Sequence, residues 1–269
     1  MTSNDSDLID YAISALADRE QIKVWSVIVS IFGDLAQNPG DEISGPYLSA
    51  ITERIGIRPE AMCVAIHRLR KDNWIENRKV GRVSQYRLSP FGHEESKAVS
   101  PRIYNKLNIG QAPSKNKWHL ILLPPGTTYH AITPSQIKIS QGVILGHGPI
   151  ASGSPDNLTV PFNELDAPVW VREAILPEPL RSAYEAFLEV LFHIGKKLPK
   201  QSQLDEIDAL VLRVLIVHNW RRLLLRHSEA VDVFFPEGWV GSECRTLVIA
   251  ILDQLPKRVA DFSSKSRTS

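Results

Sequence analysis

Residues 59–91, PEAMCVAIHRLRKDNWIENRKVGRVSQYRLSPF, decide the fold of this 269-residue chain. In the first half of the stretch, apolar side chains recur at the spacing of one helix face, at Met62, Ala65, Ile66 and Leu69. Pro59 suits the first helical turn, where its missing N–H would have no partner in any case. From Trp74 onward the pattern is extended, with a turn at residues 81–84 and alternating apolar residues in the return strand. We therefore predict a helix over residues 59–72 followed by a two-stranded ribbon.

Basic side chains gather on the same stretch. Between residues 53 and 87 there are nine Arg or Lys and four acidic residues, in a chain whose net charge is only +1. A basic face on an otherwise balanced chain is typical of proteins that contact phosphate groups. The segments before the stretch add a predicted apolar helix at 22–37, a short strand at Ile43 and a helix over 45–55. This order is that of a winged helix-turn-helix, so we predict double-stranded DNA as the partner.

The DNA-binding residues follow from this geometry. The 59–72 helix would enter the major groove, where base edges are distinguishable, and the ribbon would contact phosphates or the minor groove. The set that we predict is Arg58, Cys63, His67, Arg68, Lys71, Arg78, Lys79, Arg82 and Ser84. An alternative for Arg68 is an ion pair with Asp72, four residues on. Trp74 and Tyr86 suit packing of the ribbon better than stacking on single-stranded bases.

The rest of the chain predicts an α+β multidomain protein. Strands are expected at 118–123, 141–150, 158–162 and 169–174, followed by a helix at 180–194, and the chain reads helical from Leu204 onward. The domain boundaries that we predict are an N-terminal extension at 1–20, a winged-helix domain at 21–95, a linker at 96–116, a central α+β domain at 117–197, a helical domain at 198–261 and a disordered tail at 262–269.

Composition and motifs disfavour several other classes. Two cysteines, Cys63 and Cys244, predict neither a disulfide framework nor a metal cluster. No secretory signal and no membrane span is recognisable, so we expect a cytoplasmic protein. Residues 146–151 match a loose dinucleotide loop, but the Ser- and Pro-rich residues after them do not continue as a helix. Because no catalytic motif is recognisable either, we expect no enzyme activity, no cofactor and no metal.

Several segments resemble one known family. Residues 25–34 resemble an opening helix that ends in Phe-Gly-Asp, 65–92 resemble a recognition helix and wing, and 216–241 resemble a C-terminal signature. Residues 180–191 are similar to a Tyr-x-x-Phe-Leu helix of the same family. These blocks occur in the order and spacing of the PaaX-like transcriptional regulators, the phenylacetate-degradation repressors of bacteria.

This resemblance implies a winged helix, a central ferredoxin-like domain similar to Cas2, and a C-terminal helical domain. It also implies a homodimeric repressor of a catabolic operon, released from DNA by phenylacetyl-coenzyme A or another acyl-coenzyme A. The chain departs from the family at Cys63, where an arginine is frequent, and at His67, where a smaller polar residue is common. The charged loop and helix usual after the first central strand are reduced here to residues 124–140. The likeness to Cas2 also suggests a nuclease. Metal-dependent cleavage would need an aspartate at the end of the first central strand, where this chain has Leu122 and Leu123.

A site for the effector is predicted beside the apolar stripe of the helix at 204–228. The candidates are His218, Arg221, Arg222 and Arg226, which could hold phosphates or a carboxylate. The alternative for these residues is a domain contact or a solvated face. For the whole protein, the alternative to an effector-responsive repressor is a DNA- or protein-binding adaptor without a small-molecule effector.

Overall fold

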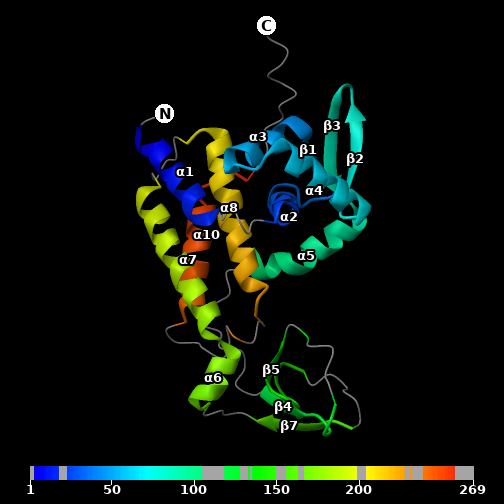
Figure 1. Ribbon diagram of the computed structural model, residues 1–269, viewed down its shortest axis with the longest axis vertical. Helices are drawn as coiled ribbons and strands as arrows, with labels where there is room; N and C mark the ends of the chain where they lie inside the picture. Colours follow the sequence, from blue (N-terminus) through cyan, green and yellow to red (C-terminus); the bar gives the residue numbers. More distant parts are fainter. Residues whose placement is uncertain are drawn as a thin grey trace. The chain divides into compact units, whose positions relative to one another are not determined.

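The computed structural model describes residues 3–17, 23–104, 118–127, 133, 135–149, 156–162, 167–198, 204–227, 231 and 239–257. The chain divides into two compact units (Figure 1). Unit 1 comprises residues 1–105, 190–221 and 247–269, and unit 2 comprises residues 106–189 and 222–246. The segment 198–261, which we expected to be a separate helical domain, is thus divided between the two units. The sequence-based boundaries stay predictions.

Unit 1 contains the elements expected within residues 59–91 and directly before them. Helix α1 (Ser3–Leu16) and helix α2 (Val24–Leu35) are followed by strand β1 (Ile43–Ser44), α3 (Gly45–Ile55), α4 (Pro59–Lys71), β2 (Ile75–Val80) and β3 (Val83–Leu88). Helix α3 is capped at its start because the Ser44 hydroxyl accepts from the backbone N–H of Tyr47, and Gly56 ends it with φ at 93°. The predicted order helix, strand, helix, helix, ribbon is confirmed.

The ribbon is an antiparallel hairpin in a three-stranded sheet of order β1-β3-β2. Val80 pairs with Val83, so the turn is Gly81–Arg82 alone and is tighter than the predicted 81–84. Gly81 has φ at 62°, at the first turn position, where glycine is favoured in two-residue hairpins. The short turn places Arg82 at the tip of the ribbon.

Helix α5 (Pro90–Tyr104) occupies the start of the segment where we expected a polar connector with a possible short helix, and it extends into the predicted linker at 96–116. Ser89 starts the helix: its hydroxyl accepts from the N–H of Gly92 at 3.0 Å, and its carbonyl accepts from the N–H of His93. Gly92 lies so close to the Trp74 carbonyl oxygen that an added Cβ would approach it to 2.1 Å. These short contacts join the start of α5 to Trp74, the residue directly before β2. The polar composition of the segment did not predict them.

Three further helices have residues in both units: α7 (Glu178–Lys197), α8 (Glu206–Leu224) and α10 (Val240–Leu252). Every residue of α8 from Asp208 to His218 is buried, so this part of the helix is enclosed on all sides. None of the helices that the structure describes is long and apolar enough to span a bilayer.

Unit 2 contains a four-stranded antiparallel sheet of order β5-β6-β4-β7. Its strands are β4 (Trp118–Leu122), β5 (Gln136–Ser140), β6 (Val143–His147) and β7 (Leu158–Phe162). Strand β5 was not predicted. The predicted strand at 169–174 is wrong: this segment is helix α6 (Val169–Ile175), which begins after Pro168 and buries Val171 and Ile175, four residues apart. The described residues between β4 and β7 contain no helix, and the ferredoxin-like assignment stays a prediction.

Candidate nucleic-acid interface

Helix α4 presents two different faces. Met62, Ala65, Ile66 and Leu69 are buried, as the spacing predicted, and the helix packs against α2 and α3. The candidate residues Cys63, His67, Arg68 and Lys71 are all exposed on the other face, and Arg58 is exposed at the N-cap. The buried stripe therefore fixes α4 in unit 1 and leaves the candidate side chains available to a partner.

Specific contacts define the conformation of the turn from α4 into β2. Asn73 has φ at 56°, in the left-handed region that asparagine tolerates better than most residues. Its carbonyl accepts a hydrogen bond from the hydroxyl of Ser89, at the other end of the hairpin. The Trp74 ring meets Phe91 edge-on at 5.5 Å, and the ring of Tyr86 lies beside Gly45. Both aromatic residues therefore pack within unit 1, which favours the packing interpretation over base stacking.

Arg68 makes the intramolecular contacts that the alternative interpretation requires. Its Nε lies 3.5 Å from the Asp72 carboxylate, and its guanidinium lies 5.5 Å from the centre of the Trp25 ring. Both charged side chains remain more than half exposed, at 63% and 51%. An exposed pair of this kind contributes about 0.3–0.5 kcal/mol, so a phosphate or base could replace Asp72 at little cost.

Two basic residues of the ribbon form ion pairs with carboxylates of unit 1. Arg78 donates two hydrogen bonds of 2.7 Å to Glu42, and Arg87 binds Glu76 at 3.0 Å. The hydrogen bond from Arg78 lowers the pKa of Glu42, and Glu42 in turn raises the pKa of Arg78. The sequence did not indicate Glu42 as a partner, because 36 residues separate the two side chains.

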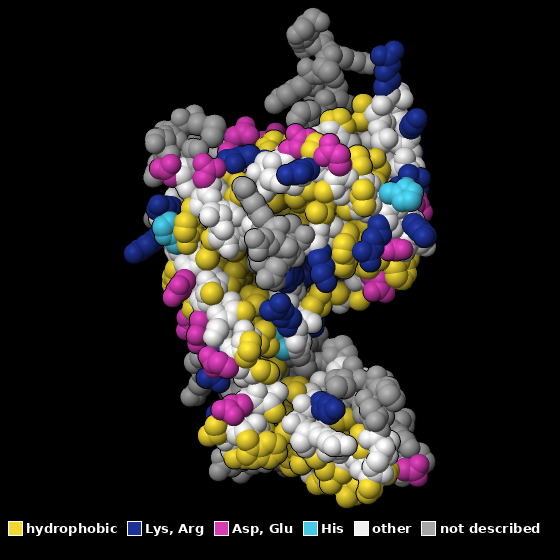
Figure 2. All heavy atoms as spheres, viewed as in Figure 1, with side chains coloured by type: hydrophobic (Ala, Val, Ile, Leu, Met, Phe, Trp, Pro, Cys, Tyr) yellow, Lys and Arg dark blue, Asp and Glu magenta, His cyan; other side chains and the backbone are white. Residues whose placement is uncertain are grey.

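Lys79 and Arg82 are exposed at the end of the ribbon, and Ser84 is half-buried. Within the part of the chain that the structure describes, no carboxylate forms an ion pair with Lys79 or Arg82. Figure 2 shows Lys and Arg side chains along the edge of unit 1 where Figure 1 draws β2, β3 and α4. Among the basic residues of the ribbon, the two near its tip therefore lack the internal carboxylate partners that Arg78 and Arg87 have in the described structure.

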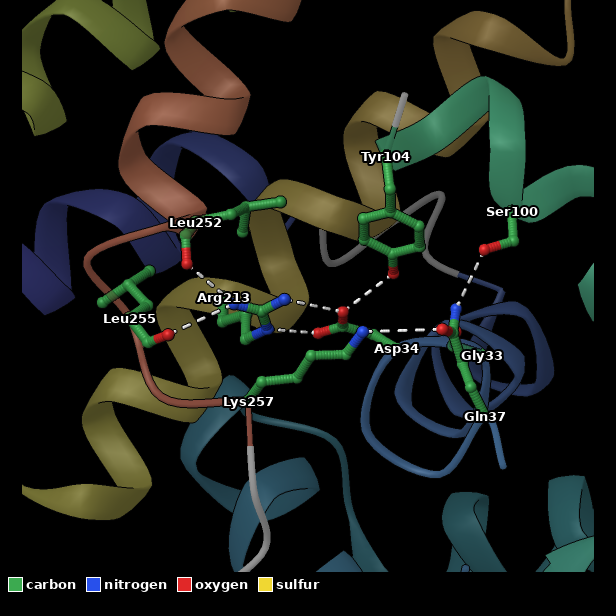
Figure 3. Close-up of polar contacts among 9 residues, drawn as sticks. All are labelled: Gly33, Asp34, Gln37, Ser100, Tyr104, Arg213, Leu252, Leu255 and Lys257. Carbon is green, nitrogen blue, oxygen red and sulfur yellow. Dashed lines mark hydrogen bonds and ion pairs between the residues drawn. The ribbon is translucent and has the colours of Figure 1, made fainter. Parts of the chain in front are cut away.

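A network of buried polar contacts fixes the position of α2, the helix against which α4 packs (Figure 3). Arg213 of α8 contacts both carboxylate oxygens of Asp34 in α2, at 2.6 and 3.0 Å, and donates to the carbonyls of Leu252 and Leu255. The Tyr104 hydroxyl donates to the same carboxylate at 2.8 Å. Burial, with a contribution from Asp34, raises the pKa of Tyr104 well above its usual range. The hydroxyl therefore stays protonated and available as a donor.

Further contacts join α8 to the helices around the candidate interface. Arg54 of α3 donates to Asp208 at 2.7 Å. Burial opposes the charged form of Arg54, but Asp208 and Asp10 together raise its pKa. Tyr47 of α3 donates to Glu206 at 3.1 Å. With the Asp34–Arg213 pair, these contacts attach α8 to both helices that support α4. Sequence reasoning missed them because each partner lies more than 150 positions away.

The predicted effector residues are divided between the two units. His218 is buried against Ser30 at 3.1 Å, and Arg221 approaches the hydroxyl of Ser26 at 3.4 Å, so both contact α2 within unit 1. Burial lowers the pKa of Arg221. Arg222 and Arg226 belong to unit 2. His218 and Arg221 therefore have partners within unit 1, which favours the alternative of a domain contact for these two residues.

Arg226 lines a pocket of about 490 Å³ in unit 2. Lys138 and His227 are the other basic side chains of this pocket, and the rest of the lining is Gln136, Ile137, Ala174, Ile175, Pro177, Pro179 and Leu180. His227 is held by a hydrogen bond with the hydroxyl of Tyr184. Apolar walls with a few basic groups can hold an anion that carries an apolar body.

The candidate interface consists of buried supporting helices, an exposed helix face and a basic ribbon, and the sequence that forms it is similar to known proteins. The family model described as PaaX-like protein matches residues 23–92, which contain α2 to β3. The model described as PaaX-like protein C-terminal domain matches residues 177–265. The chain therefore belongs to the PaaX-like protein family. It is also 26% identical to the transcriptional repressor PaaX of Escherichia coli (strain K12), over 97% of this chain and 88% of the relative.

Proposed function

We propose that this chain is a bacterial transcriptional repressor that binds double-stranded DNA through a winged helix-turn-helix. The similarity to a transcriptional repressor over nearly the whole chain supports the repressor role. The observation that carries DNA binding is the exposed face of α4 beside a basic ribbon. In this proposal α4 enters the major groove, and His67, Arg68 and Lys71 approach base edges and phosphates.

The ribbon supplies contacts that depend little on sequence. Lys79 and Arg82 would approach phosphates or the minor groove, where a basic side chain adds affinity without reading the base pair directly. Each phosphate neutralised by a basic side chain releases condensed counterions, so binding weakens as salt rises. Arg82 carries the largest share in this proposal because it lies at the tip and has no internal carboxylate among the described residues.

The test is a salt series of DNA binding by fluorescence anisotropy, with a fragment from upstream of the protein's own gene. Arg82→Ala should weaken binding to specific and random DNA alike and reduce the slope of log K against log salt by about 1. The matched control is Arg181→Ala, which removes one exposed arginine from α7 in unit 2. His67→Ala should instead change sequence preference. Identical salt slopes for wild type and Arg82→Ala would exclude the ribbon from the interface.

In more detail, we propose that the protein is a homodimer that represses a catabolic operon for phenylacetate-like aromatic acids. An acyl-coenzyme A thioester would release this homodimer from DNA. Two-fold symmetric DNA sites favour two-fold symmetric proteins, which supports the dimer. The pocket around Arg226 supports the effector because it combines basic groups with apolar walls. Such a regulator has no need of catalysis or a metal, and it would act where the DNA lies, in the cytoplasm.

Phenylacetyl-coenzyme A distinguishes this proposal from the alternative of an adaptor without an effector. Adding the thioester to the DNA complex should raise the apparent Kd, and Arg226→Ala should reduce that response without weakening DNA binding itself. Arg181→Ala again serves as the control for loss of one positive charge. Binding that neither phenylacetyl-coenzyme A nor other acyl thioesters change would favour the adaptor.

A further inference from the structure

The centre of the exposed face of α4 is a single row of side chains. Glu60, Val64, His67 and Lys71 lie four, three and four residues apart, which places them one above another along the helix. All four are exposed, opposite the buried stripe of Met62 and Leu69. Three members of the row can form hydrogen bonds or ion pairs, and Val64 alone cannot.

Val64 is the most exposed large apolar side chain in the described part of the chain, at 70%. Helix propensity does not explain it, because a β-branched residue is less favourable than alanine within a helix. Packing does not explain it either, because so exposed a side chain gains little from burial in this chain. An apolar group in the middle of a polar row instead suits contact with an apolar group on the partner.

The major groove of DNA offers one such group on its base edges. The C5-methyl of thymine is the apolar feature there, while the other exposed atoms are hydrogen-bond donors and acceptors. We propose that Val64 reads a thymine methyl group and thereby determines part of the sequence specificity of this protein. The inference rests on the proposed entry of α4 into the major groove, and it adds a residue that acts by apolar contact beside His67, Arg68 and Lys71.

The test uses sites that the full-length protein selects from a random double-stranded DNA pool. Each thymine of a selected site is replaced singly by deoxyuridine, which removes only the C5-methyl group. With wild type, at least one replacement should raise Kd about fourfold, as expected for burial of one methyl-sized group. Val64→Ala should weaken binding to the thymine site to a similar extent and should no longer distinguish thymine from uracil at that position.

Val169→Ala is the matched control, because Val169 is 69% exposed at the start of α6 in unit 2. It should keep the full thymine-to-uracil difference. Far-UV circular dichroism and thermal unfolding check that both variants fold, as expected for substitutions of exposed side chains. If wild type and Val64→Ala respond equally to every uracil replacement, the inference fails while DNA binding stands. If no sequence is enriched from the pool, the proposed function fails, and this inference fails with it.

Discussion

Removal of the Asp34 carboxylate should destabilise unit 1 severely. Asp34 is fully buried and Arg213 is 5% exposed, so Asp34→Ala would leave a buried guanidinium whose remaining partners among the described residues are the carbonyls of Leu252 and Leu255. Breaking a buried ion pair from one side costs about 3–5 kcal/mol. Tyr104 would lose its acceptor as well. A loss of that size is a large part of the about 5–15 kcal/mol that stabilises a typical folded protein.

Urea denaturation measures this loss. Trp220 is buried in unit 1 and donates to the Ile103 carbonyl, so tryptophan fluorescence should report unfolding there, with far-UV circular dichroism as a second probe. The control is Asp72→Ala, which removes the carboxylate of an exposed ion pair in the same unit and should cost less than about 0.5 kcal/mol.

A second variant separates loss of the charge pair from loss of packing. Replacing both partners, Asp34→Leu with Arg213→Met, should recover much of the stability, because an apolar pair leaves no unpaired buried charge. A loss of stability in Asp34→Ala no larger than that in Asp72→Ala would contradict this prediction. A double variant less stable than Asp34→Ala alone would contradict it as well.

Three further predictions concern the candidate interface and the two cysteines. Glu42→Gln should release Arg78 to bind phosphate, so DNA affinity at low salt should rise and the salt slope should steepen by about 1; an unchanged slope would contradict this. Ser44→Ala removes the cap of α3 and should cost about 1 kcal/mol in thermal or urea unfolding. Iodoacetamide at pH 8 should alkylate exposed Cys63 in the native protein but not Cys244, because burial raises the pKa of Cys244 to about 12 and keeps its thiol protonated. Labelling of both thiols at equal rates, measured by mass spectrometry, would show that α10 is not packed as described.

Local patterns predicted the elements of unit 1 well. The stripe of Met62 and Leu69 indicated both the helix and its buried face, and the alternation after Trp74 indicated the ribbon. Local patterns predicted the helices and strands of unit 2 less well. The segment at 169–174 has the apolar composition of a strand but forms a helix, and β5 was not recognised. Short apolar segments fit either structure, so their neighbours in the fold decide between the two.

Sequence patterns were therefore enough to predict the order helix, strand, helix, helix, ribbon, the buried and exposed faces of α4, and the basic character of the ribbon. These features depend on residues close together in the chain, so periodicity and composition reveal them. Which basic side chains are paired with distant carboxylates became visible in the folded chain alone. Folding paired Arg78 with Glu42 and buried Asp34 against Arg213, 179 positions away. The local pair of Arg68 and Asp72 could be anticipated from its spacing of four residues. Pairs between distant segments form only when folding brings those segments together, so no local pattern indicates them.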